Sequence, residues 1–175
     1  MKLDAGSEEQ LRFIYPDIAE RWRKAARAFS ELHQKEIRIT EGLRTFETQT
    51  RYWAKGRTKE PNGSWIISNP QLVITHARPG ESMHHYGLAI DICFLGHEPY
   101  PKDRKAWVEY GAVLKSFGLT WGGDWMSAAC DQPHCEDKYG FTTKEIQSFF
   151  LEHQTIVDVW DQCSQRLHLF KGNQI

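Results

Sequence analysis

The architecture of this chain is best predicted from one segment, Ser82-Met83-His84-His85-Tyr86-Gly87-Leu88-Ala89-Ile90-Asp91. It places His84 seven residues before a carboxylate, Asp91, with a glycine between them. Gly87 permits a tight bend where a side chain would obstruct the backbone. The apolar run over residues 88–94 then indicates a buried strand. We therefore expect a strand that holds Asp91 rigidly against His84.

The polar side chains of this segment suggest a metal site. Imidazole and carboxylate groups are ordinary ligands of a catalytic zinc ion, and the segment Asp131-Gln132-Pro133-His134 offers a third ligand. We predict that His84, Asp91 and His134 bind one Zn²⁺ ion per chain. The chain has eight histidines, and most of them are expected to be surface or structural residues. His85 is the nearest competitor, but only His84 has this spacing to Asp91.

The four cysteines allow a different metal site. Zinc also binds sets of three cysteines and one histidine, which here would be Cys93, Cys130 and Cys135 with His134. However, such structural sites usually show short paired spacings, and this chain has no Cys-x-x-Cys pair. Free thiols are the default for a chain of this size without a signal peptide. We therefore favour the site made of two histidines and a carboxylate.

The motifs also carry a family resemblance. Ser82-x-His84-x-x-Gly87-x-Ala89-x-Asp91, followed by Asp131-x-x-His134, resembles the zinc peptidase family named for lysostaphin, D-Ala-D-Ala metallopeptidases and sonic hedgehog. Within that family the chain is most similar to the phage L-alanyl-D-glutamate endopeptidases, which are endolysins. Weaker matches extend the resemblance over residues 41–136, at Glu41-Gly42-Leu43-Arg44-Thr45 with Gln49, Gly56-Arg57-Thr58 and Trp121-Gly122-Gly123-Asp124-Trp125.

The resemblance implies a general base for peptide hydrolysis. Three protein ligands leave a position on zinc for water, and a base must then carry a proton from that water to the leaving amine. Asp131 holds the position of the catalytic carboxylate in the phage enzymes. An alternative is that Asp131 caps a helix or holds a metal ligand in place. Glu136, expected to be exposed just past His134, is a second candidate base.

Other polar residues are expected to bind the substrate. Arg44 follows a predicted strand, and the resemblance implies that its guanidinium binds a substrate carboxylate or the oxyanion of the reaction. Its alternative role is a surface ion pair. Ser82 and Gln49 are predicted to position the substrate. Many relatives have serine where Glu41 stands, so the contacts that Glu41 makes beside Arg44 are left open. Four tryptophans are candidates for a glycan groove, although core packing is their more usual role: Trp53, Trp65, Trp121 and Trp125.

Composition limits the class of protein. With 175 residues and 40% hydrophobic residues, the chain is predicted to form one catalytic domain over residues 1–175, without a separate cell-wall-binding domain. Its net charge of −1 gives no sign of a nucleic-acid partner, and no segment is apolar enough for stable membrane insertion. The N-terminus lacks the apolar region of a signal peptide. We expect a monomer that stays in the host cytoplasm until a holin-type partner releases it to the cell wall.

The pattern along the chain predicts an α+β fold, a small antiparallel β-sheet with helices packed around it. The resemblance implies a fold like that of hedgehog and the D-Ala-D-Ala peptidases. Capping boxes are expected at residues 7–10 and 142–145, and the second opens a helical C-terminal tail over about residues 142–170. The remaining predictions are helices from Pro16 to Leu32, over 46–55 and over 103–117, strands over 37–43, 72–75 and 88–94, and a loop over 57–70.

These observations converge on a hydrolase. We predict a zinc metallopeptidase that hydrolyses the L-alanyl-D-glutamate bond of peptidoglycan stem peptides. The metal ligands, Asp131 and Arg44 argue for peptide hydrolysis from their chemistry, whereas the particular bond comes only from the resemblance. The alternatives are a D,D-carboxypeptidase or dipeptidase of the same fold, and a zinc-bearing binding module without turnover.

Overall fold

The computed structural model describes residues 3–126 and 130–172 and has the predicted α+β fold. Four strands form an antiparallel sheet in the order β1-β4-β6-β5. A separate hairpin consists of β2 and β3. The strands are β1 Ile37–Glu41, β2 Arg57–Lys59, β3 Trp65–Ile67, β4 Ala89–Phe94, β5 Thr120–Trp121 and β6 His134–Glu136.

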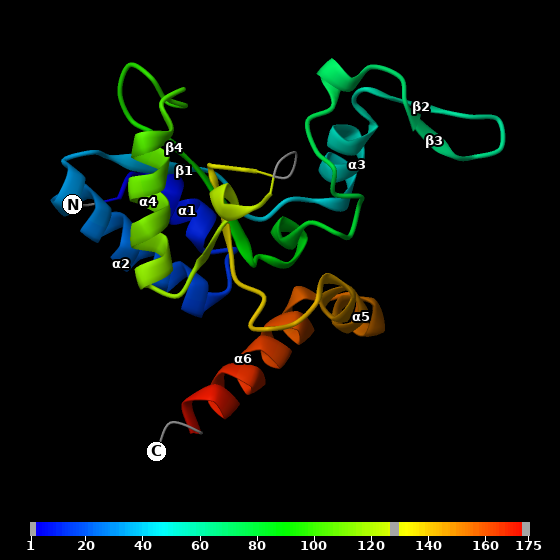
Figure 1. Ribbon diagram of the computed structural model, residues 1–175. Helices are drawn as coiled ribbons and strands as arrows, with labels where there is room; N and C mark the ends of the chain where they lie inside the picture. Colours follow the sequence, from blue (N-terminus) through cyan, green and yellow to red (C-terminus); the bar gives the residue numbers. More distant parts are fainter. Residues whose placement is uncertain (1–2, 127–129, 173–175) are drawn as a thin grey trace.

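Helices surround this sheet. Figure 1 shows α1, α2 and α4 gathered around β1 and β4, with α5 and α6 below them and the hairpin standing away on the other side. The α-helices are α1 Ala5–Leu11, α2 Pro16–His33, α3 Phe46–Ala54, α4 Arg104–Ser116, α5 Thr143–His153 and α6 Ile156–Gly172, and the short 3₁₀ helices are η1 Pro70–Leu72, η2 Met83–Tyr86 and η3 Gly122–Asp124.

The core lies between α2, α4 and one face of the sheet. Phe29 of α2 meets both Tyr110 of α4 and Phe94 of β4, with ring centroids 5.7 and 5.9 Å apart. The indole N–H of Trp22 donates a 3.1 Å hydrogen bond to the Tyr110 hydroxyl, which satisfies two buried polar groups. Apolar residues at alternate positions of β4, Ile90 and Ile92, complete this face. The opposite face of β4 carries Ala89, Asp91 and Cys93.

Helix ends follow the local sequence signals in most places. Pro16 occupies the first turn of α2, and the predicted capping box at the start of α5 is present, with Thr142 and Glu145 bonded reciprocally. The predicted capping box at residues 7–10 is wrong, because Asp4 caps α1 by accepting a hydrogen bond from the Ser7 amide. The Ser7 hydroxyl instead accepts from the backbone N–H of Ile39 in β1. The Ser7 side chain therefore makes a tertiary hydrogen bond to β1 instead of the capping hydrogen bond that the local sequence pattern predicted.

Two other predictions are wrong in the region between α3 and η2. The expected loop over 57–70 contains the hairpin of β2 and β3. The expected strand over 72–75 does not form, because residues 70–72 make η1 and the following residues have no strand partner. Leu72 and Ile74 are exposed there. Residues with a high β propensity form a strand only where a neighbouring strand pairs with them, and no strand among the described residues pairs with these two.

The C-terminal tail is helical, as predicted, and packs on the body of the protein. Ile146 of α5 and Val159 and Cys163 of α6 are fully buried. The indole N–H of Trp160 donates a 2.7 Å hydrogen bond to the backbone carbonyl of Tyr86 in η2. The tail therefore supports η2 from behind. None of the helices among the described residues combines the length and the apolar character needed to span a bilayer.

Candidate metal centre and catalytic cleft

Local geometry brings His84, Asp91 and His134 together. His84 lies in η2, and Gly87 ends that helix in the left-handed conformation (φ 63°), which glycine adopts at low cost. The chain then enters β4, where Asp91 points away from the core. Asp91 pairs directly with His134 of the antiparallel strand β6, so both side chains lie on the same face of the sheet.

The donor atoms of these three residues fit a single metal ion. Nε2 of His84 lies 3.3 Å from Nδ1 of His134, and Oδ2 and Oδ1 of Asp91 lie 3.3 and 2.9 Å from these nitrogens. One ligand atom from each residue lies within 4.8 Å of the others. Lone pairs that converge so closely repel one another unless a cation or a proton lies between them. The donor set of two imidazoles and one carboxylate is that of a catalytic zinc site.

Each imidazole is oriented by a second hydrogen bond. Nδ1 of His84 lies 2.7 Å from the carbonyl oxygen of Gly42 and donates to it, which leaves Nε2 free for a metal. Nε2 of His134 lies 3.1 Å from the carboxylate of Glu136 and donates to it, so Nδ1 is the nitrogen directed toward Asp91 and the metal position. Metal-binding histidines in proteins almost always have such partners. Glu136 was expected to be an exposed base, but it is buried and committed to His134.

The charges within the group are strongly coupled. Burial disfavours the charge on Asp91, but His84 and His134 outweigh that effect and hold the pKa of Asp91 far below its ordinary value. Burial also disfavours a charged His134, whereas Asp91 and Glu136 raise the pKa of His134 well above its ordinary value. A metal ion bound by Nδ1 must therefore displace a proton from His134.

Asp131 lies beside the metal group. Its backbone N–H donates to the carbonyl of Gly122 (3.0 Å), and its own carbonyl accepts from the His134 N–H (3.3 Å). A Cβ added to Gly122 would lie 2.5 Å from the Asp131 carbonyl oxygen, so only glycine lets the two segments approach this closely. Partial removal from water and the nearby charge of Asp91 raise the pKa of Asp131.

Arg44 reaches the same region from the other side. Its Nε donates to Oε1 of Glu41 at 2.7 Å, its Nη2 donates to Oε2 of the same carboxylate, and its Nη1 donates to Oε1 of Gln49 at 2.7 Å. Nη2 also lies 3.6 Å from Oδ2 of Asp91. Burial opposes the charge on Arg44, but its ion pair with Glu41 raises the pKa of Arg44 above its ordinary value. The guanidinium is therefore a fixed cation beside the metal group.

A β-bulge explains why Glu41 is in this network. Ile39 pairs with Ile92, but the next pair is Glu41 with Asp91, so one extra residue, Thr40, is inserted in β1. The insertion moves Glu41 from the core face to the face that carries Asp91. Simple alternation from Ile37 and Ile39 would have placed Glu41 in the core.

His85 makes a contact that its place in the sequence does not predict. Nδ1 of His85 lies 2.9 Å from the Arg44 carbonyl oxygen and donates to it, while the Arg44 N–H donates to the His84 carbonyl at 3.0 Å. The His85 ring stacks on Phe46, with centroids 4.0 Å apart. Burial lowers the pKa of His85, which keeps the ring neutral. His85 therefore fixes the backbone of Arg44, and its only sequence signal was its position next to His84.

These residues surround a cleft of about 600 Å³. The cleft is lined by the three metal-ligand candidates together with Arg44, Ser82, Trp125 and Asp131. Ser82 lies just before η2 on the cleft wall. Gln49 is fully buried behind Arg44, where it also donates a 2.7 Å hydrogen bond to the Ala77 carbonyl. Trp121 is buried in the core, so this member of the tryptophan set lies outside the cleft.

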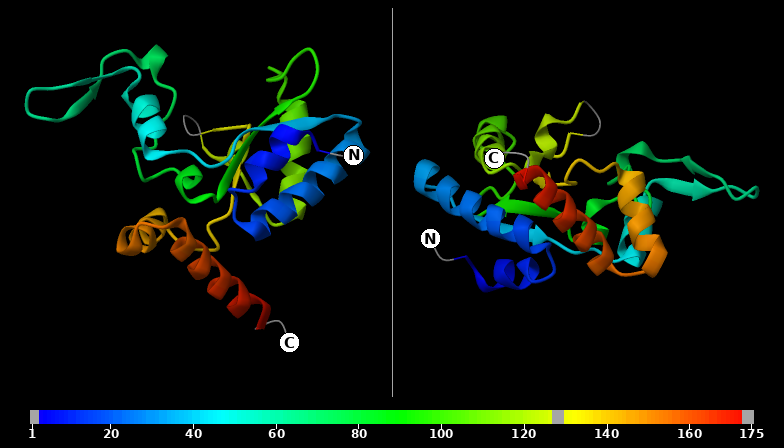
Figure 2. Two further views of the ribbon diagram at one scale, coloured as in Figure 1. Left: turned by 180° about the vertical axis from the view of Figure 1, so that it is seen from behind. Right: turned by 90° about the horizontal axis from the view of Figure 1, so that it is seen from below.

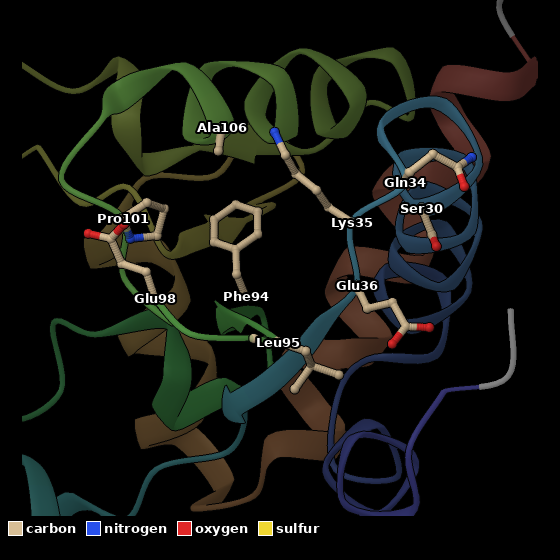
Figure 3. Close-up of a pocket in the computed structure, with 10 residues that line it drawn as sticks. Ser30, Gln34, Lys35, Glu36, Phe94, Leu95, Glu98, Pro101 and Ala106 are labelled. Atoms are coloured by element: carbon tan, nitrogen blue, oxygen red, sulfur yellow. The ribbon is translucent and has the colours of Figure 1, made fainter.

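Two other features of the structure are weaker candidates for a functional site than this cleft. The described cysteines are free, and the one group of metal-ligating side chains in the described residues contains none of them. A second pocket of about 680 Å³ lies near the end of β4, and its lining residues include Phe94, Leu95, Lys35 and Ala106 (Figure 3). None of the predicted site residues lines this pocket.

Comparison with known proteins first shows which family and which fold the chain resembles. Residues 75–137, which carry the metal group and Asp131, match the family described as D-alanyl-D-alanine carboxypeptidase. The crystal structure of Serratia marcescens L-Ala D-Glu endopeptidase ChiX matches with a TM-score of 0.53, covering 84% of this chain and 94% of that chain at 20% identity. That likeness shows a shared fold. The predicted resemblance to the D-Ala-D-Ala metallopeptidase family is confirmed.

Individual relatives are more specific. The chain is 34% identical over 111 residues to the peptidoglycan L-alanyl-D-glutamate endopeptidase CwlK of Bacillus subtilis (strain 168), covering 58% of this chain and 60% of that protein. It is 35% identical over 80 residues to the bifunctional D-Ala-D-Ala dipeptidase and D-Ala-D-Ala carboxypeptidase VanXYC of Enterococcus gallinarum, covering 46% and 37%. The matched regions thus span less than two thirds of either relative's length.

Proposed function

We propose that this protein is a zinc-dependent peptidoglycan endopeptidase that hydrolyses the bond between L-alanine and D-glutamate in the stem peptide. The observation that carries the proposal is the convergence of His84, Asp91 and His134 in one cleft with Asp131 and Arg44. The similarity to CwlK supports the choice of bond, since that protein is an L-alanyl-D-glutamate endopeptidase by name.

Zinc is the metal that best suits the three donors. His84 and His134 offer nitrogen and Asp91 offers oxygen, and three protein ligands are the usual complement of a catalytic zinc ion. A zinc ion held by these residues would polarise the scissile carbonyl and lower the pKa of the attacking water. The hydrogen bonds that the two imidazoles donate to the Gly42 carbonyl and the Glu136 carboxylate hold both rings ready for this role.

The neighbouring residues provide the proton transfer and the substrate contacts that the reaction also needs. Asp131 accepts a proton from the attacking water and delivers it to the leaving amine, and its raised pKa brings it closer to the operating pH of such a base. Arg44 binds an anionic group of the substrate, because its charged guanidinium lines the cleft beside the metal group. Ser82 contacts the substrate from the cleft wall. Gln49 positions the substrate indirectly, through its hydrogen bond to Arg44.

We propose that the biological role of the protein is that of a phage endolysin, which causes host cell lysis. Aspartate at position 131, where many of the wider family have glutamate, supports the phage branch. In that role the protein would act as a monomer on the cell wall, after a holin-type partner had released it from the host cytoplasm.

Digestion of purified peptidoglycan tests the proposal. Mass spectrometry should find new D-glutamate amino termini, and Asp131→Asn should lower turnover by about 10²–10⁴-fold while metal content is kept. His84→Ala should lose metal and activity together. Release of D-alanine alone would instead identify a D,D-carboxypeptidase, and binding without any new terminus would identify a binding module.

A further inference from the structure

The hairpin region stands apart from the rest of the molecule. We define the arm as residues 51–77, comprising the end of α3, the β2–β3 hairpin, η1 and the chain that returns toward η2. In both views of Figure 2 the hairpin projects from the body. Its large apolar side chains are between 40 and 57% exposed, and they are Trp65, Ile66, Ile67, Leu72 and Ile74. Exposed apolar groups that cluster in this way mark an interaction surface.

Contacts within the arm nevertheless hold its two limbs together. Trp65 packs edge-on against Trp53 of α3, with centroids 5.3 Å apart. The Arg57 guanidinium lies 4.7 Å from the centroid of the Trp53 ring, and its Nη2 donates to the Thr75 carbonyl at 3.1 Å. Both limbs of the arm are therefore tied to each other at their base. The exposed side chains are presented on a rigid support, which suits binding.

The surface of the arm continues into the cleft. The returning limb, Ile74 to Ala77, forms one wall of the cleft that contains the metal group. Ala77 is fixed there by its hydrogen bond from Gln49. A polymer that leaves the cleft on this side must therefore pass along the arm.

The chemistry of the substrate, taken from the proposed function, calls for such a surface. The L-alanine of a stem peptide is attached through a lactyl group to a sugar of the glycan strand. The reacting carbonyl is therefore only about 7 Å, or two residue lengths, from that sugar. A glycan strand is far too long to end within a cleft of about 600 Å³. It must run out of the cleft along one of its walls.

We propose that the arm binds the glycan strand of peptidoglycan, with Trp65 as the platform on which a sugar ring stacks. Charge complementarity favours this partner. The arm contains four cationic residues, Arg51, Lys55, Arg57 and Lys59, and one acidic residue, Glu60, although the net charge of the chain is −1. Stem peptides along the strand carry free carboxylates, which these cations attract at low ionic strength.

Two substrates separate glycan binding from catalysis. The first is insoluble peptidoglycan, and the second is a soluble stem peptide that contains L-alanyl-D-glutamate but no sugar. Trp65→Ala should lower the ratio of kcat/KM for polymer to kcat/KM for peptide by roughly 10-fold, the scale of losing one aromatic anchor. Trp65→Phe should largely restore the ratio. The matched control is Leu32→Ala, an exposed apolar residue at the end of α2, which should leave it unchanged.

The outcomes distinguish failure of the arm from failure of the proposed function. An unchanged ratio in Trp65→Ala, or an equal loss on both substrates, would overturn the role of the arm. If the wild-type protein cleaves neither substrate at the L-alanyl-D-glutamate bond, the proposed function fails, and sedimentation with peptidoglycan still tests the arm. Trp65-dependent binding to phosphatidylglycerol vesicles in preference to peptidoglycan would replace the glycan with a lipid surface and overturn the proposal.

Discussion

Trp160 provides a quantitative test of how the C-terminal tail supports the catalytic cleft. This side chain, on α6, is partly buried and donates its indole hydrogen to the carbonyl of Tyr86, two residues beyond His84. It also lies against Tyr15, with ring centroids 5.8 Å apart. We expect its removal to destabilise the whole domain, and η2 in particular.

The magnitude follows from these two contacts. Trp160→Phe keeps an aromatic ring but loses the hydrogen bond, which costs about 1 kcal/mol. Trp160→Ala also loses packing, about 2 kcal/mol for a partly buried ring that would contribute about 3–5 in a full core. For a chain of this size 1 kcal/mol shifts Tm by about 2–4 °C. The expected decreases in Tm are therefore about 2–4 °C for Trp160→Phe and about 6–12 °C for Trp160→Ala.

Thermal unfolding followed by circular dichroism measures these shifts. Val157→Ala is the matched control, because Val157 lies on the same helix with 55% of its surface exposed, and its effect should stay within about 0.5 kcal/mol. If all three variants melt with the wild type, the tail contributes no packing energy and the reasoning is refuted. A decrease for Trp160→Ala with none for Trp160→Phe would refute the hydrogen-bond part alone.

Three further predictions concern residues that support the site or the fold around it. Glu136→Gln should weaken metal binding by about 10–100-fold, measured by competition with a chelator, because Glu136 orients His134; equal affinity would contradict that role. His85→Phe should lower kcat without loss of metal, and His85→Asn should partly restore it if the amide donates to the Arg44 carbonyl. Burial holds the pKa of His85 below its unfolded value of about 6.5. The stabilisation from neutral His85 is therefore complete above about pH 6.5 and is lost as the pH falls below that value. In urea titrations, the loss of unfolding free energy caused by His85→Asn should therefore be smaller at pH 5 than at pH 7.5. Arg21→Ala should cost about 1.5–3 kcal/mol in the same urea titrations, because it leaves the partly exposed carboxylates of Asp17 and Asp137 without their shared cation.

Local sequence determined the parts of the protein that depend on neighbouring residues. A proline in the first turn begins α2, and the Thr142 to Glu145 capping box begins α5. The bend at Gly87 joins the helix that carries His84 to the strand that carries Asp91. Because seven residues separate these two groups, bond geometry and backbone preferences were enough to predict that they meet.

Contacts between segments that are far apart in the sequence determined the remaining features of the fold and the site. The pairing of β4 with β6 places His134 opposite Asp91, across 43 residues of sequence. The bulge in β1 turns Glu41 toward Arg44, whereas strict alternation would have buried it in the core. Glu136 was expected to be exposed and became buried against His134, and the segment expected to be a loop formed a hairpin. Each of these outcomes depends on which strand a segment finds as its partner. Strand pairing is an interaction between residues far apart in the chain, so the local pattern of side chains does not specify it.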